Sequence, residues 1–127
     1  MSATRKPGPL AEAMKLQRAA ARQGFDWRET GDLWAKLAEE IAELRAARTR
    51  PQRKEELGDL MFMLVNLARH LGVEPAGALA AANRKFQRRY AHIRKHLRAL
   101  PPLPDRRRLD AMEQLWQQAK RRERGGK

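Results

Sequence analysis

The stretch EELGDLMFMLVNLARHLG, residues 55–72, decides the fold that the sequence predicts. Its apolar residues recur at steps of three and four, the spacing of one face of an α-helix. That face consists of Leu57, Leu60, Met61, Leu64, Leu67, Ala68 and Leu71. Because Phe62, Met63 and Val65 extend the apolar surface around the cylinder, we expect this helix to be central and covered on most sides.

A narrow polar strip interrupts this apolar helix. It consists of Glu56, Asp59, Asn66 and His70, at helical steps with Met63 lying between Asp59 and Asn66. An ionised carboxylate on a buried surface is unfavourable, so it either finds a cation or takes up a proton. The strip is therefore a candidate functional feature.

The rest of the chain also favours helices, because Ala, Leu, Arg, Glu, Lys and Gln dominate and no window alternates as a β-strand does. Proline and glycine mark the boundaries, at KPGP (6–9), GFDWRETGD (24–32), TRP (49–51) and PPLP (101–104). We expect helices over about 10–23, 32–48, 51–72, 75–100 and 109–122. The predicted class is all-α, a compact bundle of about four to five helices.

The length of 127 residues fits one domain, which we place at 10–122 between a flexible N-terminal tail (1–9) and a basic C-terminal tail (123–127). Without cysteine, disulfides, zinc–thiolate sites and a cysteine nucleophile are excluded. The longest strongly apolar run, LMFMLV at 60–65, is too short to span a bilayer, and the N-terminus lacks the apolar stretch of a secretory signal. We expect a soluble cytoplasmic protein with no membrane partner.

The net charge is +13, and it is unevenly placed. Acidic residues concentrate between Asp26 and Asp59, whereas residues 84–98 hold seven Lys or Arg and basic clusters fill the C-terminus. Such an excess indicates a polyanionic partner, which is nucleic acid, nucleotide phosphates or an anionic membrane surface.

The acidic residues gather on two predicted helices joined by a short break at about 49–52. Glu39, Glu40 and Glu43 share one side of the first helix, and Glu56 and Asp59 lie on the second. An antiparallel hairpin brings these two sets face to face. Converging carboxylates suit Mg²⁺ or Mn²⁺, which prefer oxygen ligands. The alternative is a solvated acidic face, in which Lys36 pairs with Glu40 four residues on.

The basic half also has two interpretations. Lys85 and Arg89 lie among aromatic residues in NRKFQRRYAHIRKHL (83–97), and Trp116 and Lys120 share a helix face four residues apart. These cations can bind phosphate while the Trp ring stacks on a base. Alternatively, the aromatic residues are core and the cations are a solvated face.

Several blocks together resemble a known family. EExxE at 39–43 and ELGD at 56–59 are similar to the paired motif of the all-α nucleoside triphosphate pyrophosphohydrolases. GFDW (24–27), residues 55–72, ANRKFQRRY (82–90) and MEQLWQQAK (112–120) resemble the catalytic C-terminal domain of its MazG branch. The resemblance covers about residues 10–122 in the right order, and departs from the usual connector at the Pro-rich segment 98–108.

The resemblance implies Mg²⁺-dependent hydrolysis of nucleoside triphosphates to monophosphate and pyrophosphate, with Mn²⁺ as an alternative metal, in nucleotide-pool house-cleaning. It implies that the metal ligands are Glu40, Glu43, Glu56 and Asp59, and that the other catalytic residues are Glu39, Lys36, Lys85 and Arg89. The implied substrate-binding residues are Lys85, Arg89, Trp116, Lys120 and Asn66. The family is typically dimeric through helix packing, so a homodimer is expected.

One rival function belongs to another class. A non-enzymatic basic helical protein that binds nucleic acid also explains the charge of +13 and the C-terminal arginines. It assigns no role to Glu40, Glu43, Glu56 and Asp59, and it predicts binding that weakens steeply with salt.

Overall fold

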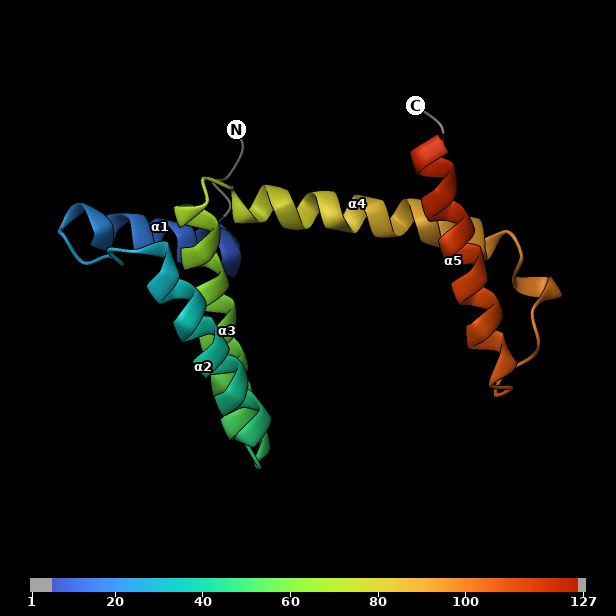
Figure 1. Cartoon of the computed structure of the whole chain (residues 1–127), viewed down its shortest axis with the longest axis horizontal. Coiled ribbons are helices and arrows are strands. Elements are labelled where there is room, and N and C mark those ends of the chain that lie inside the picture. Colours follow the sequence, from blue (N-terminus) through green and yellow to red (C-terminus); the bar gives the residue numbers. More distant parts are fainter. Residues whose placement is uncertain (1–5, 126–127) are drawn as a thin grey trace. The chain divides into compact units, whose positions relative to one another are not determined.

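The all-α class is confirmed by the computed structural model, which describes residues 6–125. This part of the chain holds five α-helices, one short 3₁₀ helix and no β-strand. The helices are α1 (Pro9–Arg22), α2 (Thr30–Ala46), α3 (Arg50–His70), α4 (Pro75–Arg94) and α5 (Arg107–Gly125), with the 3₁₀ helix η1 over Leu97–Ala99 (Figure 1). Within these residues, no helix is both long and apolar enough to cross a membrane.

The chain divides into two units, Met1–Ala78 and Leu79–Lys127, and α4 begins in the first and continues in the second. In the first unit α3 contacts both α1 and α2. Figure 1 shows α2 and α3 side by side, as the predicted antiparallel hairpin requires. The core of the hairpin consists of Leu33 and Leu37 from α2 with Met63 and Leu67 from α3, and Trp27 and Leu60 pack against it.

Local signals place the helix ends of the first unit. The Thr49 hydroxyl accepts a hydrogen bond from the Gln52 amide, and the Gln52 side chain accepts one from the Thr49 amide, so a capping box opens α3. Gly24 (φ 93°) and Gly72 (φ 73°) follow α1 and α3 in the left-handed conformation that glycine adopts most readily. The predicted ends of these two helices are confirmed to within two residues.

Helix α4 ends earlier than predicted. The pattern indicated a helix to about residue 100, but α4 stops at Arg94, and a turn and η1 follow. Nδ1 of His96 donates a hydrogen bond to the His92 carbonyl, 3.0 Å away, which satisfies one of the last carbonyls of α4. Leu100 then adopts extended backbone (ψ 151°), as a residue before proline does.

The surface of α3 is more open than predicted. Leu57, Met61, Leu64 and Leu71 are 48–55% exposed in the single chain, although they share one side of the helix. The expectation that α3 is covered on most sides is therefore wrong for one chain alone. The reason is that α1 and α2 contact α3 on its other sides, where Met63, Val65 and Leu67 are buried.

At the C-terminus, α5 extends to Gly125, three residues beyond the predicted end, with a last turn rich in arginine. Residues 1–5 and 126–127, which include most of the predicted N-terminal tail and the end of the predicted C-terminal tail, lie outside the described residues.

Candidate active site

Three carboxylates meet where α2 faces α3. Oxygen atoms of Glu40, Glu43 and Glu56 all lie within 4.8 Å of one another, which is close enough to share one metal ion. Glu40 and Glu43 lie one turn apart on α2, and Glu56 comes from α3 across the turn. Three of the four predicted metal ligands are thus brought together by the hairpin.

The surroundings of these carboxylates favour a cation. Oε2 of Glu40 and Oε2 of Glu56 are buried, and neither has a hydrogen-bond partner among residues 6–125. Such an oxygen loses its water without compensation, which is unfavourable unless a positive charge lies nearby. Loss of water, the neighbouring Glu43, and the charges of Glu40 and Asp59 raise the pKa of Glu56. A divalent ion would fit this donor set, since its charge would offset the unpartnered carboxylate oxygens.

Asp59, the fourth predicted ligand, does not belong to this trio of oxygens. It lies one turn beyond Glu56 on α3, is exposed, and acts on the pKa of Glu56 through its negative charge. Its role as a ligand stays a prediction.

Lys36 borders the cluster from the preceding turn of α2. Its ammonium lies 3.4 Å from an oxygen of Glu39 and 3.5 Å from Oε1 of Glu40. The Glu39 carboxylate is 58% exposed, as in a solvated acidic face, whereas the Glu40 side chain is 8% exposed. The alternative of a solvated acidic face therefore describes Glu39 but not Glu40. Lys36 offsets only part of the negative charge, because Oε2 of Glu40 still has no partner among the described residues.

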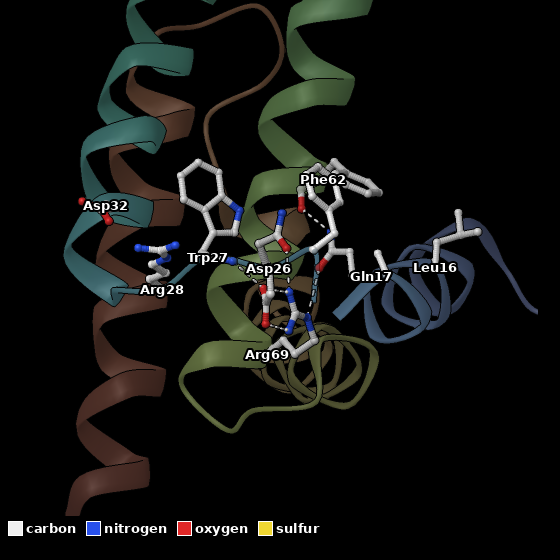
Figure 2. A pocket seen from close by; sticks show the side chains of 11 residues that line it. Leu16, Gln17, Asp26, Trp27, Arg28, Asp32, Phe62 and Arg69 are labelled. Carbon is white, nitrogen blue, oxygen red and sulfur yellow. Dashed lines mark hydrogen bonds and ion pairs between the residues drawn. The ribbon is translucent and has the colours of Figure 1, made fainter. Parts of the chain in front are cut away.

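A cavity of about 510 Å³ lies elsewhere in the first unit, between α1, α3 and the connector that precedes α2. Its apolar walls include Leu16, Phe25, Trp27 and Phe62. Figure 2 shows Asp26 and Arg69 meeting inside this group, with the rings of Trp27 and Phe62 above them in the view. The cavity is large enough to accept a small organic ring.

An ion pair fixes the polar side of this cavity. Two nitrogens of Arg69 donate to the two oxygens of Asp26 at 2.8 and 2.9 Å, and His70 lies 3.0 Å from the same carboxylate. The hydrogen bonds from Arg69 hold the pKa of Asp26 far below its usual range. Arg69 also donates to Gln17 of α1, which in turn donates to the Phe62 carbonyl. The network joins the connector and α1 to the second half of α3.

Asn66, a predicted substrate-binding residue, lines the same cavity and is 6% exposed. Its Oδ1 accepts a bond from Arg69, whereas within residues 6–125 its Nδ2 has only the Met63 sulfur as a partner, at 3.7 Å. Sulfur is a weak acceptor, so this buried amide retains donor capacity.

The remaining predicted residues belong to the second unit. The Arg89 guanidinium lies 5.4 Å from the centre of the Trp116 ring and forms an ion pair of 2.9 Å with Glu123. Trp116 also packs against Phe86, with 5.6 Å between ring centres. Arg89 and Trp116 are thus brought together, while Lys85 is exposed and Lys120 is half-buried.

Comparison with known proteins decides the family. A family profile described as phosphoribosyl-ATP pyrophosphohydrolase matches residues 9–86, which is more than half of the chain and includes both acidic motifs. The chain belongs to this pyrophosphohydrolase family.

Similarity to curated relatives identifies the branch of the family to which the chain belongs. A nucleoside triphosphate pyrophosphohydrolase of Escherichia coli K12 is 40% identical over 119 residues, which are 90% of this chain and 45% of the relative. The nucleoside triphosphate pyrophosphohydrolase/pyrophosphatase MazG of Thermotoga maritima is 36% identical over 115 residues, or 87% of this chain and 44% of the relative. The predicted resemblance to MazG is confirmed, and the chain spans somewhat less than half the length of these relatives.

Two features of this pyrophosphohydrolase family member escaped sequence reasoning. The first is the pairing of Asp26 with Arg69, 43 residues apart, although Asp26 lies in the GFDW block. The second is Glu123, which forms an ion pair with Arg89 although the sequence places it only in the basic tail. The one available signal was an acidic residue within a basic run, KRRERGGK.

Proposed function

We propose that this protein hydrolyses nucleoside triphosphates to the monophosphate and pyrophosphate with the help of Mg²⁺. The observation that carries the proposal is the carboxylate trio of Glu40, Glu43 and Glu56, with its two buried oxygens unpartnered within the described residues. Membership of a pyrophosphohydrolase family supports the reaction type. The names of the relatives support a nucleoside triphosphate as substrate.

The residues of the first unit have distinct proposed roles. Glu40, Glu43 and Glu56, joined by Asp59, hold Mg²⁺, with Mn²⁺ as the alternative ion. When bound, the ion neutralises phosphate charge and lowers the pKa of a water ligand. Glu39, exposed beside the trio, orients the attacking water, and Lys36 limits the negative charge by pairing with Glu39 and Glu40.

Residues for substrate recognition are proposed in each unit by itself. Lys85, Arg89 and Lys120 stabilise the phosphate charge by charge-assisted hydrogen bonds, and Trp116 offers a ring for stacking. Asn66 directs a buried amide into an apolar cavity and contributes a hydrogen-bond donor to the nucleoside.

The assembly proposed for this function is a homodimer. The exposed face of α3, formed by Leu57, Met61, Leu64 and Leu71, is apolar over four turns of helix. A face of this kind is covered in a stable protein, and a second copy supplies a matching apolar surface. In this dimer, some residues of each chain contact the substrate that the other chain binds. We further propose that the protein works in the cytoplasm, where it removes unwanted nucleoside triphosphates.

The rival function, a purely nucleic-acid-binding protein, is not favoured for the first unit. It gives no role to neighbouring carboxylates that repel one another, and a structural protein gains nothing from that repulsion. An experiment separates the two functions directly.

The experiment measures pyrophosphate and monophosphate release from a panel of standard and modified nucleoside triphosphates and phosphoribosyl-ATP. Each reaction is run with Mg²⁺, with Mn²⁺ and with EDTA. We expect release of both products that depends on the metal. Glu43→Gln, which removes one charge from the trio, should reduce kcat by at least about a hundredfold, since metal and water positioning contribute on that scale.

The matched control is Glu55→Gln, which makes the same change at an exposed position outside the trio. It should retain wild-type turnover. The absence of turnover across the panel at every metal concentration would refute the proposed reaction, and equal loss in both variants would refute the assignment to the trio.

A further inference from the structure

The net positive charge of this protein is almost confined to one unit. Residues 79–127 hold 15 of the 28 Lys and Arg but only 4 of the 15 Asp and Glu, so they carry +11 of the net +13. No acidic residue occurs between Glu74 and Asp105, a stretch that contains seven Lys or Arg. The excess of Lys and Arg over Asp and Glu therefore lies along α4 and the segment after it.

The proposed nucleotide site uses few of these cations. It engages Lys85, Arg89 and Lys120, which leaves twelve Lys and Arg of residues 79–127 without a role. Ion pairs within residues 79–125 absorb little of the excess, since Asp105 pairs with Arg107, and Glu123 pairs with Arg89 and, at 3.5 Å, with Arg88. Unbalanced charge on this scale raises the free energy of the folded state by self-repulsion unless a polyanion offsets it.

Part of this charge forms a straight stripe on α4. Arg84, Arg88 and Lys95 are exposed and follow one another at steps of four and seven, which places them on one side of the helix. At 1.5 Å per residue the stripe is about 16 Å long. The backbone bond from the Lys95 amide to the Ala91 carbonyl continues the helical geometry to its last member. The stripe flanks the face of α4 on which Arg89 and His92 contact α5.

We propose that this stripe of Arg84, Arg88 and Lys95 binds the phosphate backbone of double-stranded nucleic acid, separately from the nucleotide site. A duplex carries about one negative charge per 1.7 Å, so a rigid row of cations can follow it without exposed aromatic residues. Single strands are usually held by aromatic stacking, but here Phe86 stacks on Tyr90, and Trp116 is assigned to the proposed nucleotide site.

The test uses the full-length protein and a fluorescein-labelled DNA duplex of unrelated sequence, with anisotropy measured between about 50 and 200 mM salt. Wild type should bind with log K falling linearly with log salt. The variant Arg84→Gln/Arg88→Gln/Lys95→Gln should weaken binding more than tenfold at the lowest salt. It should also reduce the slope of log K against log salt by about 2–3 in magnitude, since each lost phosphate contact lowers that slope by about 0.9.

A matched control removes the same charge from a comparable stripe in the first unit, Lys15→Gln/Arg18→Gln/Arg22→Gln on α1, where all three residues are exposed. It should retain wild-type affinity and salt dependence. Both triple variants should keep wild-type far-UV circular dichroism. Pyrophosphate release should also be unchanged in the stripe variant, because its three residues lie outside the proposed nucleotide site.

Four results would overturn the proposal: no duplex binding at the lowest salt, equal loss in the two triple variants, tighter binding to single strands or to anionic vesicles than to the duplex, and displacement of the duplex by excess Mg–nucleotide. The last result would assign these cations to the nucleotide site. Because the readout is binding, the proposal stands or falls independently of the pyrophosphohydrolase reaction.

Discussion

Glu40 and Glu56 each bury one carboxylate oxygen that has no partner within the described residues. Burial of an unpartnered charged group carries one of the larger free-energy penalties in a folded protein. Such a group is retained where a bound ligand removes that penalty. The metal ion proposed for this cluster would remove the local repulsion. Metal binding should be coupled to stability through these two side chains.

Glu56→Gln tests this coupling. Because the substitution removes a charge that Glu40, Glu43 and Asp59 oppose, the metal-free variant should unfold at a higher temperature than metal-free wild type at pH 7. Wild type should gain about 2.7 kcal/mol when Mg²⁺ is present at a hundred times its Kd, whereas the variant should gain much less. Differential scanning calorimetry with and without Mg²⁺ measures both effects. A metal-free variant that is less stable than wild type would contradict this account, and Glu55→Gln is the control.

Asp26 provides a prediction about pH. The hydrogen bonds from Arg69 lower the pKa of Asp26 in the folded state, so the pair stabilises the protein above the unfolded pKa, about 3.9. That stabilisation is lost as the pH falls below this value toward the folded pKa. Asp26→Asn should lower the free energy of unfolding at pH 7 by roughly 1–3 kcal/mol, since it leaves Arg69, whose side chain is 13% exposed, without its counter-charge.

Urea unfolding of wild type and Asp26→Asn from pH 7 down to about pH 3 measures the difference. The gap between the two proteins should narrow as the pH falls below about 4. Asp32→Asn is the control, because Asp32 is an exposed acid of the same cavity with no ion pair among the described residues. A gap that stays constant with pH would show that the ion pair is not the cause.

At the scale of elements, the α2–α3 hairpin positions the carboxylates. Glu43 lies near the end of α2 and Glu56 near the start of α3, so their meeting depends on where the turn between them begins and ends. The capping box of Thr49 and Gln52 defines that point, since it satisfies the Gln52 amide of the first turn of α3 and the Thr49 amide before it.

Thr49→Ala should destabilise the protein by about 1 kcal/mol, because the Gln52 amide loses its acceptor. Thr49→Ser retains the hydroxyl and should be close to wild type. Urea denaturation of the three proteins measures the effect. Equal stability of Thr49→Ala and Thr49→Ser would indicate that the cap does not stabilise α3.

At the scale of the whole molecule, the exposed apolar face of α3 predicts association of two chains. Leu57, Met61, Leu64 and Leu71 lie on one side of the helix, and four half-exposed large residues in a row form a patch that a monomer rarely leaves open. The homodimer is the simplest closed arrangement that covers it.

Light scattering after size-exclusion chromatography tests this association. Wild type should have twice the 14.6 kDa mass of the chain. Met61→Lys/Leu64→Lys should elute as a monomer, because two charges in an apolar interface are strongly unfavourable. Leu103→Lys, at a residue that is 78% exposed in the second unit, should remain dimeric. A monomeric wild type, or a dimeric double variant, would refute the role of this face.

The sequence by itself determined the all-α class, the position of each helix to within a few residues except for the end of α4, and the hairpin that makes α2 face α3. These features depend on residue periodicity and on Pro, Gly, Thr and Gln at the boundaries, which act over one or two turns. It also identified the acidic motifs, because carboxylates at helical spacing on two adjacent helices are visible in the chain itself.

Only the tertiary structure decided which atoms meet. It selected Glu40, Glu43 and Glu56 as the trio, joined Asp26 to Arg69, and left one face of α3 open. The physical reason is that helical spacing determines which residues lie on one side of a helix. The rotation and offset of one helix against another depend instead on packing across the whole unit. Contacts such as the one between Asp26 and Arg69, 43 residues apart, follow from that packing and leave no local pattern.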